Sequence, residues 1–275
     1  MARGGDHLCN DLHIASPALG GKNRGPIALN MNAFSDSLSL AGQLILHADA
    51  TLWRIVGLSL RVSATACVVG AGLGLVLGAW LAVARFRGQA VVVGALNTLL
   101  ALPSVVVGLI VYLLLSRSGP LGSWGILFTP TAMVIAQTVL VLPVIAALTR
   151  QLVGDSLRDG GDQLLSMGAR PLTCALLMLL HDRWAVLTIL IAAFGRAIAE
   201  VGAVMVVGGN IDGFTRVMTT AIALETSKGD LPLALALGLI LLAVVLLLNA
   251  LISALRRWRE RLDGGVAAPA AVLAS

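Results

Sequence analysis

Charged side chains are scarce in this 275-residue chain, of which Asp, Glu, Lys and Arg make up only 12%. A soluble domain carries about 25% charged residues, because its surface stays in water. Hydrophobic residues reach 58%, and the mean hydropathy is +0.94. The shortage of charge therefore excludes an ordinary soluble domain and indicates that much of the surface faces lipid.

Aromatic residues are scarce as well, at 4% of the chain, which leaves few rings to stack on nucleic-acid bases. The formal net charge is +5, but the arginines lie mostly at the ends of apolar runs, as in the cytoplasmic loops of membrane proteins. We therefore predict a lipid bilayer as a partner, and no nucleic acid.

Cysteine is limited to Cys9, Cys67 and Cys174, and no two of them form a CxxC pair. The sequence thus predicts neither a disulfide framework nor a zinc site. The first 30 residues read as a disordered tail, or as a stretch before a true start at Met31. Ligand-type residues alternate in this tail; a metal site there is the alternative to a solvated tail, and we predict no metal site. They are His7, Cys9, Asp11 and His13.

Catalytic motifs are also missing. A phosphate loop ends in Gly-Lys-Ser/Thr, whereas Lys22 is followed by Asn and Lys228 by Gly. The sequence has no His/Glu metal-ligand motif and no Gly-x-Ser-x-Gly turn, and its start does not resemble a cleaved signal peptide. We expect no catalytic residue in this chain, so any energy for its work must come from another protein.

Long apolar runs are what the sequence has in abundance. A helix needs about 20 mostly apolar residues to cross the hydrocarbon core, and helices satisfy their own backbone in lipid. Five runs meet this length, so we predict an all-α integral membrane protein of about five spanning helices. The runs are 62–84 (in a helix that begins near Leu52), 89–116, 126–148, 184–207 and 231–255.

Basic residues predict the orientation, because cytoplasmic loops hold the excess of Lys and Arg. With the N-terminus outside and the C-terminus in the cytoplasm, the inner segments 85–88, 150–183 and 256–262 hold ten arginines. The outer loops 117–125 and 208–230 hold three basic residues. These are Arg117, Arg216 and Lys228. The chain then divides into a tail and pre-helix segment (1–50), a membrane domain (51–256) and a cytoplasmic tail (257–275).

Small residues recur at every fourth position of the first run, which lets another helix approach closely. They are Ala66, Gly70, Gly74, Gly78 and Ala82. Pro103 and Pro143 fall inside the second and third runs, where each is expected to bend its helix.

The inner segment of about 155–182 is too polar to span and too patterned for a linker. Residues 159–167 are predicted to form a short helix that Gly168 ends, and Pro171 to open a second helix. An apolar face is expected on this second helix at Leu172, Ala175, Leu176 and Leu179. We predict a two-helix element at the cytoplasmic surface, able to dock in a groove of a soluble partner.

This element resembles the coupling loop of binding-protein-dependent ABC permeases, E-A-A-x3-G followed by I-x-L-P. Asp162, Gly168 and Leu180 match the acidic, Gly and Leu positions, while Gln163, Leu164, Met178 and His181 depart from the pattern. The resemblance implies that the residues of the coupling loop are Asp162, Gly168, Ala169, Arg170 and Leu180.

The fourth run is similar to the R-A-x-x-E-x-G-A signature of sulfate, molybdate and tungstate permeases, from Arg196 to Ala203. The stretches 208–211 and 215–226 resemble the tungstate branch in particular. The likeness covers roughly residues 55–255. It implies a type I ABC importer permease fold, a homodimer, two cytoplasmic ATP-binding subunits that hold ATP and Mg, and a periplasmic oxyanion-binding protein, with no cofactor in this chain.

Arg196 and Glu200 lie four residues apart within a span, so they can form an ion pair in the core, line the translocation path, or both. Backbone and hydroxyl donors near the outer mouth are expected to meet the oxyanion. These are Gly208, Gly209, Asn210, Thr215, Thr219 and Thr220. Gly-Gly-Asn is also an ordinary turn, which stays the alternative.

Three other functions remain open. The same machine can carry molybdate or sulfate, since these dianions are similar in size and the binding protein distinguishes them. A secondary transporter needs coupling-ion residues and usually an internal repeat, neither of which the sequence offers. A scaffold without transport leaves the charged fourth run unexplained.

Overall fold

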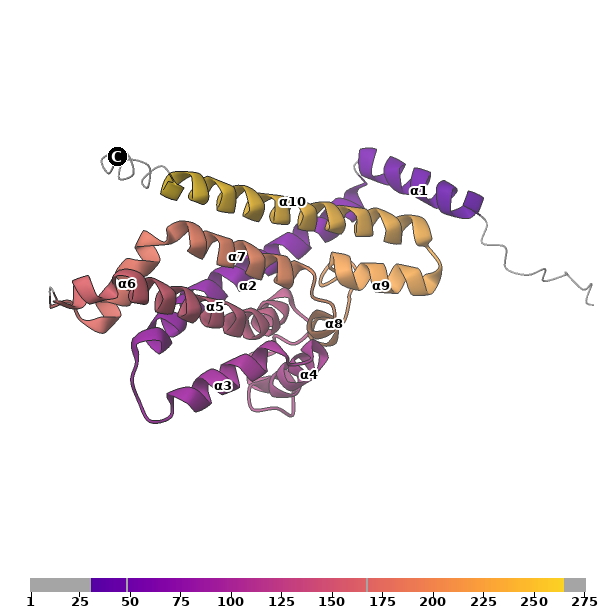
Figure 1. Cartoon of the computed structure of the whole chain (residues 1–275). Helices are drawn as coiled ribbons and strands as arrows, with labels where there is room; N and C mark the ends of the chain where they lie inside the picture. The colour runs from indigo at the N-terminus through magenta and orange to yellow at the C-terminus, as the bar shows by residue number, and fades with distance from the viewer. Residues whose placement is uncertain (1–30, 48, 167, 265–275) are drawn as a thin grey trace, which may run out of the picture.

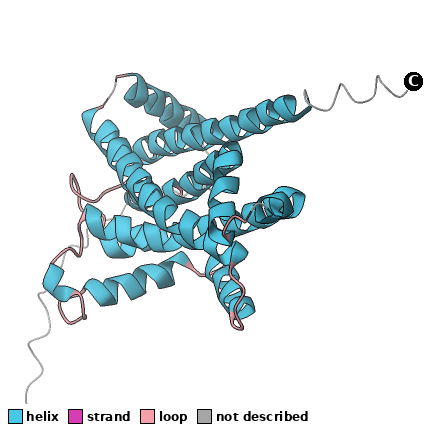
Figure 2. Ribbon diagram, turned by 90° about the vertical axis from the view of Figure 1, so that its left-hand side faces the viewer, coloured by secondary structure: helices cyan, strands magenta, loops and turns pink. Residues whose placement is uncertain are grey.

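The computed structural model describes residues 31–47, 49–166 and 168–264, and in these residues every regular element is a helix (Figures 1 and 2). The elements follow the chain as α1 (Met31–Leu46), α2 (Ala50–Val83), α3 (Gln89–Leu100), α4 (Ser104–Leu115), the short 3-10 helix η1 (Gly122–Trp124), α5 (Pro130–Ser166), α6 (Pro171–His181), α7 (Arg183–Ile198), α8 (Gly202–Gly208), α9 (Met218–Lys228) and α10 (Leu231–Gly264). The prediction of an all-α protein is confirmed.

The helices α2, α5 and α10 are each long and apolar enough to cross a membrane. Two bent pairs raise the number of possible spans in the described chain to five. The pair α3 and α4 bends by 102°, and the pair α6 and α7 bends by 79°. The chain is therefore a multi-pass membrane protein with three continuous spans and broken helices between them.

The second and fourth apolar runs are not single helices, contrary to the prediction. Pro103 lies between α3 and α4 and caps α4, because a proline disfavours the helical conformation of the residue before it. Pro143 does lie inside α5, as expected. The fourth run breaks after Ile198 and resumes as α8 at Gly202.

The third run is longer than expected. The segment 159–166 is not a separate helix but the last part of α5, because no proline interrupts the chain between Pro143 and Ser166. Gly168 follows with a positive φ of 82°, so the predicted stop is confirmed. We call the end of α5, Gly168 and α6, residues 155–182, the elbow.

The stripe of small residues on α2 packs against α5 of the same chain. A Cβ atom on Gly74 would lie 2.9 Å from the Ile145 side chain, and one on Gly78 only 2.5 Å from the Ala146 oxygen. The glycines thus let α5 pack directly on the backbone of α2. The predicted close helix approach is confirmed.

The helix α1 was not predicted, since residues 31–50 were assigned to a tail. It packs against α10, and Ala41 is fully buried in a cluster with Leu52 and Leu237. Asp49 then caps α2 by accepting the Leu52 amide at 3.0 Å. Residues 1–30 and 265–275, including the ligand-type cluster of the tail, lie outside the described residues.

The bundle has two distinct ends. The elbow and the last turns of α10 lie at one end, and α1 and α9 lie at the other (left and right in Figure 1). Trp184 at the start of α7 contacts Trp258 of α10, with ring centroids 4.8 Å apart. The inner segments of the sequence prediction lie after α2, from the end of α5 to the start of α7, and in the last turns of α10, so they gather at the elbow end.

Candidate functional site

The turn of the elbow is built by residues 168–171. Gly168 adopts the left-handed conformation that glycine accepts without strain, and no atom lies within 4 Å of the Cβ that a substitution would add. Arg170 then caps α6, and its oxygen accepts the Cys174 amide at 2.9 Å. Pro171 occupies the first turn of α6, where its missing N–H costs nothing.

One side of α6 is fixed to the bundle. Ala175 is buried against Ala79 of α2 and Val153 of α5, and Leu179 joins this cluster. The Ser156 hydroxyl donates a hydrogen bond to Asp182 at the junction of α6 and α7. A force applied to α6 therefore reaches α2, α5 and α7 directly.

The other side of α6 is apolar and exposed. Leu180 is 70% exposed, although it lies on a surface helix outside the long spans. Three more leucines of α6 are exposed to a smaller extent, by 43–44%, namely Leu172, Leu176 and Leu177. The expected apolar face was partly wrong, since Ala175 and Leu179 pack inward while Leu172 and Leu176 point out. Exposed leucines in such a patch indicate a surface that lipid or a partner protein covers.

The elbow residues of the sequence prediction are thus brought together, with one exception. Gly168, Ala169 and Arg170 form the turn, and Leu180 lies on the exposed side of α6. The side chain of Asp162 lies outside the described part of the structure. Its backbone belongs to the α5 part of the elbow, six residues before Gly168.

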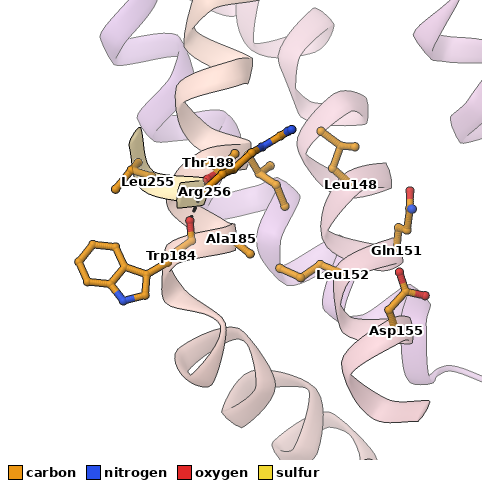
Figure 3. A pocket seen from close by; sticks show the side chains of 10 residues that line it. Leu148, Gln151, Leu152, Asp155, Trp184, Ala185, Thr188, Leu255 and Arg256 are labelled. Atoms are coloured by element: carbon orange, nitrogen blue, oxygen red, sulfur yellow. Dashed lines mark hydrogen bonds between the residues drawn. The ribbon is translucent and has the colours of Figure 1, made fainter. Parts of the chain in front are cut away.

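Two cavities near the elbow have arginine in their lining, and the second also has Asp155. A cavity of about 890 Å³ lies between α2, α5 and α6, and Arg85, Arg150 and Arg158 line it. A second one of about 280 Å³ lies between α5, α7 and α10, and Figure 3 shows Arg256 reaching toward Leu148 across it. These arginines come from the inner segments that the charge pattern predicted.

The break between α7 and α8 is stabilised by side chains from other helices. Gln137 of α5 donates to the Ala197 oxygen at 2.9 Å, and Thr219 of α9 donates to the Glu200 oxygen at 2.8 Å. Backbone that leaves a helix at membrane depth needs such partners. The Oε1 atom of Gln137 is buried and has no hydrogen-bond partner among the described residues.

The predicted ion pair between Arg196 and Glu200 is absent from the described structure. Glu200 lies in the break rather than on a helix, so the four-residue spacing does not place the two groups on one helical face. Its Oε1 accepts the Ala203 amide at 3.3 Å and so caps α8. Arg196 is exposed, yet it lines the same crevice as Glu200 and Gln137.

The opposite end of the bundle holds a compact loop before α9. Gly209 and Asn210 both adopt positive φ angles, of 69° and 51°. The Thr215 hydroxyl donates to the Gly208 oxygen at 2.6 Å, and the Thr220 hydroxyl donates to the Val217 oxygen at 3.1 Å. The Gly-Gly-Asn sequence thus forms a turn, and Thr215 of the same loop holds it together.

The residues predicted for the outer mouth are therefore clustered, but their hydroxyl protons are in use. Thr215, Thr219 and Thr220 are all buried and each donates to a backbone oxygen. Contact between these residues and an oxyanion stays a prediction. The Asn210 amide nitrogen donates to the Thr220 oxygen at 3.3 Å.

Charged residues that the sequence analysis did not assign to the outer mouth lie in and beside this loop. Arg216 is within 3.3 Å of Asp212 and 3.7 Å of Glu225, and Glu225 also binds Lys228 at 2.9 Å. Arg54 and Arg61 of α2 line a cavity with Arg216. Their seven-residue spacing on one helical face was the available signal.

No protein-family model matches the chain. It is 44% identical to a probable anion ABC transporter permease protein of Haloferax volcanii, over 78% of this chain and 93% of that protein. It is 40% identical to the tungstate uptake system permease protein TupB of Peptoclostridium acidaminophilum, over 82% of this chain and 99% of that protein.

A second tungstate uptake system permease protein TupB, from Campylobacter jejuni, is 41% identical over 58% of this chain and 67% of that protein. Similarity at lower identity reaches a putative molybdenum transport permease and several sulfate transport permeases. Each of these relatives carries the name of a transport-system permease.

Proposed function

The chain belongs to the family of permease subunits of anion ABC transporters, and we propose that it forms the membrane path of an ATP-driven tungstate importer. The observation that carries the proposal is 40% identity to a tungstate uptake permease over 99% of that protein's length. The elbow supports the ATP-driven part, because it joins an exposed apolar surface to three helices of the bundle.

In the proposed machine, two cytoplasmic subunits bind ATP and Mg, and each holds one elbow. The permease itself hydrolyses nothing, in keeping with the lack of a phosphate loop in its sequence. The exposed leucines of α6 supply the contact with the ATPase. Closure of the ATP-binding subunits then moves α2, α5 and α7 through the contacts of Ala175 and Ser156.

We propose that two copies of the permease line one path. Arg196 is exposed thirteen residues into α7, about 20 Å from the start of that helix. A charge at such a depth needs a partner or a water-filled cavity, because lipid disfavours it by several kcal/mol. A homodimer with Arg196 facing the shared path meets this requirement, and its positive charge suits a dianion.

The proposed orientation places the elbow in the cytoplasm of a cell with a plasma (inner) membrane, with the N-terminus outside. Basic residues at the elbow end support it, among them Arg85, Arg150 and Arg256. A periplasmic oxyanion-binding protein then delivers its cargo at the end that holds α9.

Tungstate is the proposed cargo, and molybdate or sulfate is the alternative that the more distant relatives favour. Driving by an ion gradient has less support. The sequence offers neither a set of coupling-ion residues nor an internal repeat. Glu200, in the break after α7, accepts the Ala203 amide through its Oε1.

Uptake of tungstate into proteoliposomes tests this function. The complex of permease and ATPase is reconstituted with the loaded binding protein outside, and internal tungsten is counted by mass spectrometry. We expect uptake that requires both internal ATP and the binding protein, with tungstate preferred over molybdate and sulfate. A vesicle without ATP but with an imposed sodium or proton gradient is the control. Uptake in that control would indicate a secondary transporter instead.

A further inference from the structure

Three arginines converge on one cavity at the end opposite the elbow. Arg54 and Arg61 come from the first third of α2, and Arg216 comes from the loop before α9. The cavity measures about 300 Å³, and one carboxylate, that of Asp212, lines it beside the arginines. Three positive charges and one negative charge leave the lining with a balance of +2.

The depth of this cavity follows from the uncharged run that begins after Arg61. Residues 62–84 contain no charge, and as a helix these 23 residues cover about 35 Å, enough for the hydrocarbon core. Arg61 therefore lies at the boundary of the membrane, on the side away from the elbow. Arg54 lies about 10 Å further out. In the proposed orientation, cargo arrives at this depth.

The concentration of cations here is unusual for an outer surface. Outer segments are poor in Lys and Arg, as the positive-inside rule requires. Five such residues of the described chain fall on the outer side, and three of them line this one cavity. The five are Arg54, Arg61, Arg117, Arg216 and Lys228. Insertion of the protein in the proposed orientation does not require these three arginines to lie together, so their clustering needs another explanation.

The guanidinium groups keep donors available. Arg216 is held in place by Asp212 and Glu225, and its buried Nε has no hydrogen-bond partner among the described residues. The Nη1 atom of Arg54 lies 3.6 Å from the position of a Cβ on Gly213, so its guanidinium covers the loop backbone. Neither Arg54 nor Arg61 forms an ion pair within the described residues.

We propose that this cavity is an entry site for a tetrahedral dianionic oxyanion, bound by Arg54, Arg61 and Arg216 before it enters the membrane path. The inference rests on the proposed function and names the outer residues that meet the cargo. Guanidinium groups match the paired oxygens of such an anion, and the lining balances its two charges. Asp212 lowers the local positive potential, so the anion is released again.

Equilibrium dialysis tests this site. The detergent-purified complex of permease and ATPase, without binding protein, is dialysed against sodium tungstate, and bound tungsten is counted by mass spectrometry. We expect saturable binding that weakens at least ~10-fold in the double variant Arg54→Gln/Arg61→Gln, because two charge-assisted contacts are lost. Both residues are exposed, so these substitutions spare the core. Arg216 is left intact because its ion pairs hold the loop.

Arg117→Gln is the matched control, since it removes an outer arginine that does not line the cavity. It should keep wild-type binding. Non-saturable binding, or equal affinity in the double variant, would overturn the site. Phosphatidylglycerol carries a phosphate group that the same arginines can hold, so the dialysis is repeated with this lipid, and its retention is followed by native mass spectrometry.

Retention of phosphatidylglycerol that depends on Arg54 and Arg61, without tungstate binding, would assign the cavity to lipid headgroups and overturn the proposal. A second contrary result is a double variant that keeps wild-type tungstate binding in dialysis and still loses stimulation of the ATPase by the loaded binding protein. That result would overturn the proposal, because the two arginines would then serve to dock the binding protein. Tungstate uptake by the wild-type complex is measured in parallel. If the wild-type complex takes up tungstate but shows no saturable binding in dialysis, only the entry site is wrong. If the wild-type complex takes up no tungstate, the proposed function fails.

Discussion

Gly168 occupies a conformation that most side chains avoid. At its φ of 82°, a residue with a Cβ is disfavoured by about 1–2 kcal/mol, and a β-branched residue by more. We expect Gly168→Val to leave membrane insertion intact, because no span changes, and to reduce co-purification of the ATPase several-fold. The measurement is the ratio of ATPase to permease after affinity purification.

Gly168→Asn is the control for this prediction. Asparagine tolerates the left-handed region, and open space surrounds the position in either variant, so the two differ mainly in backbone conformation. The Asn variant should retain the ATPase. Wild-type co-purification with the Val variant would refute a role of this turn in docking.

Residue types alone predicted the turn but not the use of the hydroxyl groups. Gly168 and Pro171 act through backbone conformation, which is local, so both were placed correctly. Thr219 looked like a free donor, but it binds a carbonyl that only the break after α7 exposes. Arg54 and Arg61 were passed over because their partner, the loop at Arg216, is distant in sequence.

The element that organises the bundle is the contact between α2 and α5. A Cβ on Gly78 would lie 2.5 Å from the Ala146 oxygen and 2.7 Å from the Thr149 Cβ, closer than real atoms approach. We expect Gly78→Val to force the helices apart and to destabilise the protein by about 1–3 kcal/mol. Thermal unfolding in detergent, followed by tryptophan fluorescence, measures the effect.

Gly72→Val is the matched control on the same helix, because a Cβ at Gly72 meets nothing within 4 Å. Both variants change the helix propensity equally, so the difference between them reports the contact with α5. Equal shifts in the unfolding temperature would show that the close approach contributes nothing.

The continuous spanning helices were predicted well, because a long uncharged run identifies each one. The helices that break within a run were not predicted. The uncharged runs of α2, α5 and α10 are long enough to identify each span without knowledge of its neighbours. The breaks at Pro103 and after Ile198 depend on partners in other helices, such as Gln137, that satisfy the freed backbone. The helix α1 was missed because its burial depends on α10, which is distant in sequence.

At the scale of the whole molecule, the bundle leaves large apolar surfaces uncovered. Only 17% of the apolar stretch of α10 is buried, compared with 56% for α5. Lipid can cover such a surface, but it cannot satisfy the exposed charge of Arg196. A second copy of the chain and an ATPase at each elbow complete the assembly that we propose.

The side of the membrane on which the elbow lies decides whether a cytoplasmic ATPase can reach it. Leu180→Cys on the elbow and Ser123→Cys in η1 replace exposed residues at the two ends of the bundle. In a background without the native cysteines, a membrane-impermeant thiol reagent is applied to spheroplasts and to inverted vesicles. We predict that the Leu180 position reacts only in inverted vesicles and the Ser123 position only in spheroplasts. Reaction of the Leu180 position in intact spheroplasts would place the elbow outside, beyond the reach of any ATPase, and would contradict the proposed importer.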